Sequence, residues 1–207
     1  MTSGNRAGMI EFHFDFISPF GFFASLRIDE IGARHGYATD WQSMLVGISV
    51  LKVMGLKAIP ATPLKGEYAR NDAERYCRRH GIELARPFGE TPANPLPAGR
   101  SFHWARKHAP EQAKALAKAI FAAYWLEGRD IGSLDLVLDL AGHHGIDRSA
   151  LAEGHASGEA SDLLRRAVDR SLEKGVFGSP FFIVEGEPFF GVEKLELMEE
   201  WIEAGGW

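Results

Sequence analysis

The order of hydrophobic and polar residues at the start of the chain predicts a strand, a helix and a second strand. Hydrophobic and polar side chains alternate over residues 9–14, which is the period-2 pattern of a strand. Ser18 and Pro19 are typical of the first residues of a helix, and apolar residues then recur at helical spacing as far as Gly36. Residues 37–46 are the next extended candidate. This order predicts two parallel strands joined by a right-handed crossover.

The middle of the chain has the periodicity of helices and no convincing strand pattern. Six prolines between positions 60 and 97 break this region into turns. The helical segments predicted here are 47–58, 67–81, 101–108, 111–127, 131–145, 147–154 and 157–174.

The strand pattern returns near the C-terminal end. Residues 180–184 and 188–190 are short hydrophobic runs on either side of a turn at 185–187, which predicts an antiparallel hairpin, and an amphipathic helix over 192–204 follows. Strand, helix, strand, hairpin and helix is the order of a thioredoxin fold. The sequence therefore predicts an α/β protein with a thioredoxin-like domain, residues 9–46 and 175–204, and a large all-helical insertion domain, residues 47–174.

Composition and charge narrow the possible partners. Of the 207 residues, 45% are hydrophobic and 25% are charged, as in ordinary folded proteins and unlike fibrous or disordered chains. A formal net charge of −5, with basic residues spread along the chain, argues against a nucleic-acid or anionic-membrane partner. The longest mostly apolar stretch, 115–126, is too short to cross a bilayer. We therefore expect a cytoplasmic protein with a small-molecule ligand.

Cysteine and histidine spacing excludes several kinds of site. Cys77 is the single cysteine, so the chain cannot form an intramolecular disulfide, a Cys-x-x-Cys redox pair or a thiolate-rich metal site. His143 and His144 are adjacent and would point about 100° apart on a helix. No His-x-x-x-His spacing accompanies them, and we expect no metal.

Ser18 is the first candidate for chemistry. It lies between the first strand and the first helix, where free backbone N–H groups and the positive end of the helix dipole favour an anion. A serine at this position can also cap the helix without any further role, stabilising it by about 1 kcal/mol. The residue alone is compatible with both interpretations.

Two motifs with the same Ser-Pro-Phe ending favour the functional interpretation. They are FDFISPF at 14–20 and GVFGSPF at 175–181. With these motifs the whole chain resembles the 2-hydroxychromene-2-carboxylate isomerases, relatives of the kappa-class glutathione transferases on a DsbA-like thioredoxin fold with a helical insertion. Further segments that carry the resemblance are 63–68 (PLKGEY), 71–84, 128–131 and 190–195.

The resemblance implies a set of glutathione-binding residues. Ser18, the catalytic candidate, stands where disulfide oxidoreductases have their first active-site cysteine, and Pro180 would be cis and face it. Ser179 would offer its backbone N–H and C=O to the cysteinyl part of glutathione. The other implied residues are Lys65, which would reach the glycyl carboxylate, Asn94, which would line the pocket, Val192, and Glu193, which would lie close to the γ-glutamyl amine.

Some of these positions have simpler interpretations. Lys65 and Asn94 lie in proline-rich surroundings, where a solvated loop residue is as good an explanation. Glu193 falls in the first turn of a predicted helix, where the dipole alone favours an acidic residue. An entry into a strand is the corresponding explanation for Ser179 and Pro180.

The implied activity is a glutathione-dependent isomerisation of an aromatic hydroxy-keto acid such as 2-hydroxychromene-2-carboxylate, through reversible addition of the thiolate. Free glutathione is only about 3% thiolate at neutral pH, so a site that stabilises the anion meets the chemical need. The resemblance also implies a homodimer.

A kappa-like glutathione transferase and a non-catalytic thioredoxin-like binding module are the alternatives. Two departures from the family pattern bear on them. Gly55 is followed by Leu56 and Lys57 where many relatives have Gly-Asn, and Ser179 replaces the usual apolar residue before the proline.

Overall fold

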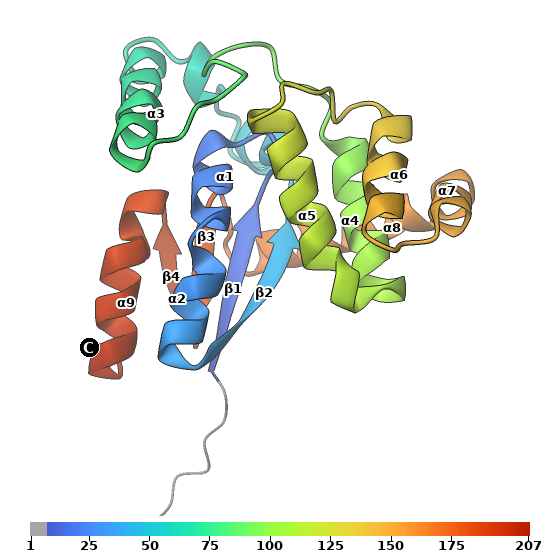
Figure 1. The fold of residues 1–207 in the computed structure, drawn as a ribbon. Helices are drawn as coiled ribbons and strands as arrows, with labels where there is room; N and C mark the ends of the chain where they lie inside the picture. The colour runs from blue at the N-terminus through green and yellow to red at the C-terminus, as the bar shows by residue number, and fades with distance from the viewer. Residues whose placement is uncertain (1–7) are drawn as a thin grey trace, which may run out of the picture.

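The computed structural model describes residues 8–207, in which one sheet is surrounded by helices (Figure 1). The strands are β1 (Gly8–Phe14), β2 (Tyr37–Ser43), β3 (Phe181–Val184) and β4 (Glu187–Phe190). The α-helices are α1 (Pro19–Ser25), α2 (Ile28–His35), α3 (Lys65–His80), α4 (Leu96–His108), α5 (Pro110–Trp125), α6 (Leu134–His143), α7 (Arg148–Ala156), α8 (Glu159–Glu173) and α9 (Leu195–Ala204). Shorter helical segments are the π-helix η1 (Gly47–Val53) and the 3-10 helices η2 (Ile59–Ala61) and η3 (Val192–Lys194).

The sheet has the strand order β2–β1–β3–β4. β1 is parallel to β2 and antiparallel to β3, and β3 is antiparallel to β4. The predicted parallel pairing of the first two strands and the predicted antiparallel hairpin are therefore both confirmed. The hairpin turn is made by Glu185 and Gly186, whose φ angles of 52° and 94° are the positive values that a tight two-residue turn requires.

Alternation along β1 decides what each face of the sheet packs against. Phe12 and Phe14 are fully buried on one face, where Phe14 contacts Phe102 of α4 and Phe121 of α5 at ring-centroid distances of 5.6 and 5.2 Å. His13 points to the other face and hydrogen-bonds the side chain of Ser171 on α8. The helices therefore cover both faces of the sheet.

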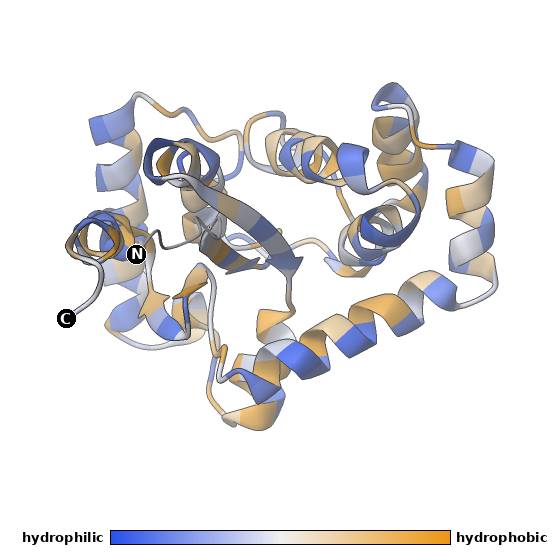
Figure 2. Ribbon diagram, turned by 90° about the horizontal axis from the view of Figure 1, so that it is seen from below, coloured by the Kyte–Doolittle hydropathy of each residue, from blue (hydrophilic) through white to orange (hydrophobic). Residues whose placement is uncertain are grey.

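Helix α8 is amphipathic, as its predicted periodicity requires. Figure 2 shows hydrophobic and hydrophilic residues alternating along the helices, so that each has an apolar side to bury. The buried residues of α8 recur at helical spacing and are Ala160, Leu164, Ala167, Val168 and Ser171.

The single helix predicted up to Gly36 is wrong, because the structure has two helices there, α1 and α2. The break falls at Leu26 and Arg27. Just before it, the Ser25 hydroxyl donates to the Phe22 carbonyl at 2.6 Å. A serine hydroxyl that bonds back to the preceding turn competes with the helical ladder, which accounts for the interruption.

Other boundaries also differ from the prediction: the strand predicted over 37–46 ends at Ser43, and the helix predicted over 192–204 is η3 followed by α9. Three further differences have a visible cause. The helix predicted over 47–58 is the shorter η1, and Gly55 beyond it has a φ of 64° that no right-handed helix continues. α4 begins at Leu96, because Pro97 lies in its first turn, where a proline has no hydrogen bond to break. α6 begins only after Ser133, whose side chain caps it.

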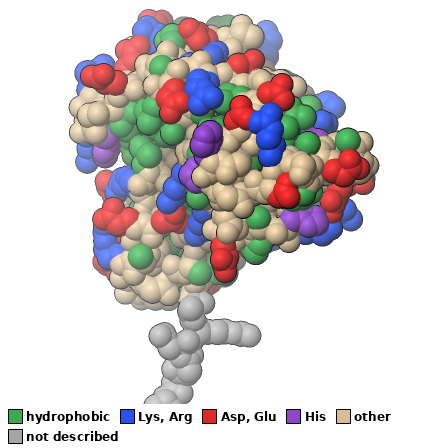
Figure 3. Space-filling view, turned by 45° about the vertical axis from the view of Figure 1, so that its right-hand side comes forward, with side chains coloured by type: hydrophobic (Ala, Val, Ile, Leu, Met, Phe, Trp, Pro, Cys, Tyr) green, Lys and Arg blue, Asp and Glu red, His purple; other side chains and the backbone are tan. Residues whose placement is uncertain are grey.

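The carboxyl ends of β1 and β2 point toward the end of the molecule that carries α3 (Figure 1). Over residues 8–207, none of the helices has the length and apolar character needed to cross a membrane. On the face shown in Figure 3, acidic and basic side chains are interspersed, with hydrophobic side chains between them.

Candidate active site

Ser18 connects the start of α1 to the turn before β3. It is the N-cap of α1, and its Oγ accepts the backbone N–H of Gly21 at 3.1 Å. The same hydroxyl donates to the backbone C=O of Ser179 at 3.1 Å. Ser18 therefore caps the helix and also contacts the turn that contains Pro180.

Besides the bond from Ser18, two further hydrogen bonds hold the Ser179–Pro180 turn. The bond between these two residues is cis, as the sequence resemblance implied. The Ser179 Oγ accepts the backbone N–H of Asp15 at 2.9 Å, and the Pro180 C=O accepts the N–H of Gly191 at 3.1 Å. A Cβ on Gly21 would lie 2.6 Å from the Ser179 Oγ, so glycine is what permits α1 to approach the turn.

The start of α1 leaves one backbone N–H group without a partner among residues 8–207, beside the Ser18 hydroxyl that donates to Ser179. Pro19 has no N–H, and the N–H groups of Gly21 and Phe22 bond to the Oγ and C=O of Ser18. Within the part of the chain that the structure describes, the N–H of Phe20 has no hydrogen-bond partner. An anion at this position would meet the Phe20 N–H and the Ser18 hydroxyl.

Asp15 is hydrogen-bonded through its backbone to both Ser18 and Ser179, and it is a functional candidate that the sequence analysis missed. Its side chain is buried, and its carboxylate accepts the N–H groups of Ile17 at 3.2 Å and Val46 at 2.8 Å. Burial raises the pKa of Asp15 to about 6, although the two hydrogen bonds oppose the shift. The signal available in the sequence was a carboxylate between two phenylalanines, a residue type that is seldom buried without a specific arrangement.

Val192 and Glu193 lie beside this site. Their segment, η3, contacts α1, and its neighbour Gly191 bonds to the Pro180 carbonyl. Val192 is buried, while Glu193 is exposed with its carboxylate over Gly191.

The structure does not connect Lys65 and Asn94 to Ser18 by hydrogen bonds. Lys65 is the exposed first residue of α3, and its side chain has no hydrogen bond or ion pair with any described residue. The Asn94 Oδ1 accepts the N–H of Leu96 at 3.1 Å and so supports the start of α4. Ser18, Ser179 and Pro180 therefore form the centre of the site, Val192 and Glu193 lie beside it, and Lys65 and Asn94 have no hydrogen bond to it.

Exposed hydrophobic side chains gather between β2 and α3. This segment begins next to the site, because Val46 is hydrogen-bonded to Asp15. Its exposed hydrophobic residues are Leu51, Val53, Met54, Leu56, Ile59 and Leu64.

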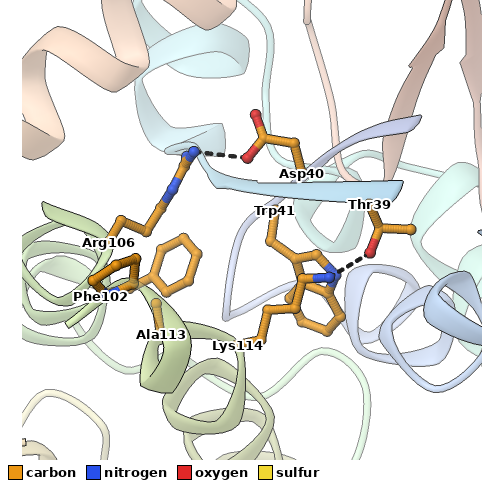
Figure 4. A pocket seen from close by; sticks show the side chains of 8 residues that line it. Thr39, Asp40, Trp41, Phe102, Arg106, Ala113 and Lys114 are labelled. Atoms are coloured by element: carbon orange, nitrogen blue, oxygen red, sulfur yellow. Dashed lines mark hydrogen bonds and ion pairs between the residues drawn. The ribbon is translucent and has the colours of Figure 1, made fainter. Parts of the chain in front are cut away.

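The lone thiol and a separate pocket do not contribute to this site. Cys77 on α3 is half-buried, and burial raises the pKa of its thiol, which disfavours a nucleophilic thiolate. A pocket of about 210 Å³ lies between β2, α4 and α5 (Figure 4). Its charged side chains are paired: Arg106 bonds to Asp40 at 2.7 Å and Lys114 to Thr39 at 2.6 Å.

A serine at the start of the first helix that faces a cis-proline turn, on a sheet of this strand order, defines a thioredoxin-like protein with an inserted helical segment. Residues 9–203 match the family described as the DSBA-like thioredoxin domain, and the chain belongs to that family.

Similar proteins are known across nearly the whole length of the chain. A curated 2-hydroxychromene-2-carboxylate isomerase of Sphingobium xenophagum is 25% identical over 198 residues, which are 93% of this chain and 97% of the relative. One of Pseudomonas putida is 26% identical over 196 residues, 92% of each chain. A solved structure of a 2-hydroxychromene-2-carboxylate isomerase has a TM-score of 0.81 at 23% identity, covers 95% of each chain and shares the fold.

Proposed function

We propose that this chain is an isomerase that uses glutathione as a cofactor and acts on 2-hydroxychromene-2-carboxylate or a related aromatic hydroxy-keto acid. The observation that carries the proposal is the Ser18 hydroxyl, 3.1 Å from the Ser179 carbonyl, in a chain that matches named isomerases over 92–93% of its length. The fold alone is no argument, since one fold supports many reactions. Thiol–disulfide exchange is disfavoured because it needs a cysteine thiol at the start of α1, and this position holds Ser18. The single cysteine of the chain, Cys77, lies on α3.

Two charged residues that the sequence resemblance assigns to the site could recognise the charged ends of a tripeptide. Lys65 and Glu193 are exposed and, among residues 8–207, have no hydrogen-bond or ion-pair partner that would have to be displaced. An ammonium and a carboxylate are the groups that recognise a terminal carboxylate and an α-amine. The Ser179 carbonyl has a second lone pair that can accept an amide N–H.

Ser18 can change its hydrogen-bond partner when a thiolate is present. Its hydroxyl has one hydrogen, which the Ser179 carbonyl accepts at 3.1 Å. A charged sulfur is a stronger acceptor than a neutral carbonyl, so the hydroxyl would turn toward it while its oxygen still accepts the N–H of Gly21. Lowering a thiol pKa by about two units corresponds to about 2.7 kcal/mol, which this hydroxyl and the N–H of Phe20 would supply together.

Bound glutathione would supply a thiolate that adds reversibly to a conjugated double bond and is regenerated. The exposed hydrophobic side chains between β2 and α3 offer a surface for the aromatic part of the substrate.

A thermal-shift titration and a turnover assay test this function together. Glutathione at 100 times its Kd should stabilise the protein by about 2.7 kcal/mol. Turnover of 2-hydroxychromene-2-carboxylate should require glutathione and leave the concentration of free thiol unchanged. A loss of free thiol with turnover would identify a transferase, and a melting curve that glutathione does not move would contradict the cofactor.

The same titration on charge variants tests how the tripeptide ends are held. Lys65→Ala and Glu193→Ala should each weaken glutathione binding, because each removes a charge partner. Arg166→Ala and Glu200→Ala are the controls, since both residues are charged and exposed, on α8 and α9, and neither belongs to the predicted site. Equal affinities in all four variants would remove Lys65 and Glu193 from the site.

A further inference from the structure

Asp15 joins three segments that are far apart in the sequence. Its carboxylate accepts the N–H of Ile17 in the turn after β1 and the N–H of Val46 just before η1. Its backbone N–H donates to the Ser179 Oγ at 2.9 Å, and its backbone C=O accepts the N–H of Ser18 at 3.0 Å. The residue is 1% exposed.

We propose that Asp15 is a positioning residue for the candidate active site, and that its ionised carboxylate holds the start of η1 against the turn that presents Ser18. The inference rests on the proposed function, because it explains how the glutathione site keeps its shape. It concerns a residue that would not touch glutathione. The π-helical form of η1 fits this role, since π-turns are frequent at functional sites.

The two hydrogen bonds to the carboxylate depend on its charge. An ionised carboxylate only accepts hydrogen bonds, whereas a protonated one carries an O–H that opposes one of the two N–H donors. Protonation would therefore weaken the contact with either Ile17 or Val46. Loss of the Val46 contact would release the start of η1 from the turn that contains Ser18.

Burial, and not a neighbouring charge, brings the pKa of Asp15 close to the pH of ordinary binding experiments. Burial raises its pKa to about 6, the bonds from Val46 and Ile17 lower it, and no charged side chain of the described residues contributes. On the adjoining β1 and α4 the nearby titratable groups include His13 and His103, and burial lowers the pKa of both. The site should therefore loosen as the pH falls through about 6.

The buried charge of Asp15 supports the shape of the site but lowers the stability of the folded chain at neutral pH. The pKa of Asp15 is higher in the folded chain than in the unfolded chain, so its favourable effect on folding is present below the unfolded pKa of 3.8 and is lost as the pH rises through about 6. At neutral pH the buried charge opposes folding. A neutral amide in its place should leave the melting temperature unchanged or higher, while the site loses one of its anchoring bonds.

The test compares the wild-type chain with Asp15→Asn and with a matched control, Asp147→Asn. Asp147 also accepts two backbone N–H groups, but it is exposed at the start of α7. In wild-type protein the amide signals of Ile17, Val46 and Ser18 in 1H–15N spectra should move together between pH 5 and 8 with a midpoint near 6. Asp15→Asn should abolish that titration and shift the Ser18 signal, whereas Asp147→Asn should change neither.

S-Methylglutathione is the binding probe, because it has no thiol that titrates in this range. Its Kd for the wild-type protein should increase below pH 6, and Asp15→Asn should bind it about tenfold more weakly at pH 7.5 without a lower melting temperature. Asp147→Asn should change the melting temperature little, because asparagine caps a helix about as well as aspartate, and should leave the Kd unchanged. If no variant binds the probe but the Ser18 signal follows Asp15, the positioning is supported and the proposed function is contradicted. Fixed Val46 and Ser18 signals from pH 5 to 8, or wild-type affinity in Asp15→Asn, would overturn the inference.

Discussion

At the scale of single residues, Ser18 combines a structural and a chemical role in one hydroxyl group. Its oxygen accepts from Gly21 as any helix cap does, and its hydrogen is donated to the Ser179 carbonyl. The cap alone is worth about 1 kcal/mol. The proposed chemistry depends on the hydrogen, which a ligand thiolate can attract away from the carbonyl.

Ser18→Ala separates these two roles when it is compared with Ser133→Ala. Ser133 caps α6 by accepting the N–H of Leu136 and lies in the helical insertion. Both variants should lose about 1 kcal/mol of stability. Ser18→Ala alone should also raise the pKa of the bound glutathione thiol and lower turnover by roughly ten- to a thousandfold, the range for losing one hydrogen bond to a developing anion.

The measurements are thermal unfolding, a spectroscopic titration of the thiolate in the complex, and kcat for each variant. An unchanged thiol pKa in Ser18→Ala would show that Ser18 is a cap only and that backbone N–H groups hold the thiolate.

The centre of the site could be predicted from sequence, but its supports could not. Ser18, Ser179 and Pro180 lie in two motifs whose resemblance to a known family identifies them. Asp15 acts through Val46 and Ser179, which are 31 and 164 residues away, and no local pattern contains such pairs. Long-range hydrogen bonds become visible only when the chain is folded.

At the scale of elements, periodicity identified the strands and most helices, and local chemistry decided their ends. β1 and the β3–β4 hairpin follow from alternation and from a turn that accommodates positive φ angles. The separation of α1 from α2 depends on the Ser25 hydroxyl bonding to the preceding turn, which leaves the spacing of apolar residues unchanged. For the same reason the pattern over 47–58 could not distinguish an α-helix from the π-helix η1.

Helix α1 can approach the cis-proline turn only because residue 21 is glycine. In Gly21→Ala the new methyl group would meet the Ser179 Oγ at 2.6 Å and the Asp15 carbonyl at 3.3 Å. We expect a loss of about 1–3 kcal/mol from overpacking and weaker glutathione binding, because Ser179 must move. Urea denaturation and calorimetric titration with glutathione measure the two effects.

Gly142→Ala is the control for this substitution. Gly142 lies in α6, where an added methyl group meets no atom within 4 Å. The free energy of unfolding should increase by about 0.5–1 kcal/mol, as expected for alanine in a helix. A stabilised Gly21→Ala with unchanged glutathione affinity would show that α1 does not require this close approach.

At the scale of the whole molecule, one core joins the sheet to the inserted helices. Phe14 of β1 contacts Phe102 and Phe121, and Phe16 lies 5.0 Å from Phe121 between ring centroids. These residues belong to a single cluster of buried side chains that includes both the sheet and α4 to α6. Continuous packing of this kind keeps the helical segment in a fixed position relative to Ser18.

The carboxylate of Asp29 also joins the sheet to the inserted helices, at the surface of the protein. Asp29 of α2 accepts hydrogen bonds from Thr39 and from the indole N–H of Trp41 on β2, and it pairs with Lys114 and Lys118 of α5. Burial opposes its ionisation, but the hydrogen bonds from Lys118 and Thr39 and the attraction of the two lysines outweigh this effect. They hold the pKa of Asp29 at about 2.

Asp29→Asn should therefore destabilise the protein in a pH-dependent way. The folded pKa of about 2 lies below the unfolded value of 3.8, so the contribution is fully present above pH 4 to 5 and is lost as the pH falls toward 2. With allowance for partial exposure we expect a loss of about 1–2 kcal/mol at pH 7 and about half of that at pH 3, measured by urea denaturation at both pH values.

Asp162→Asn is the control, because Asp162 pairs with Arg165 on the exposed side of α8 and should change stability by less than about 0.5 kcal/mol. A loss in Asp29→Asn that is equal at pH 7 and pH 3 would mean that the shape of the side chain, and not its charge, joins α2, β2 and α5.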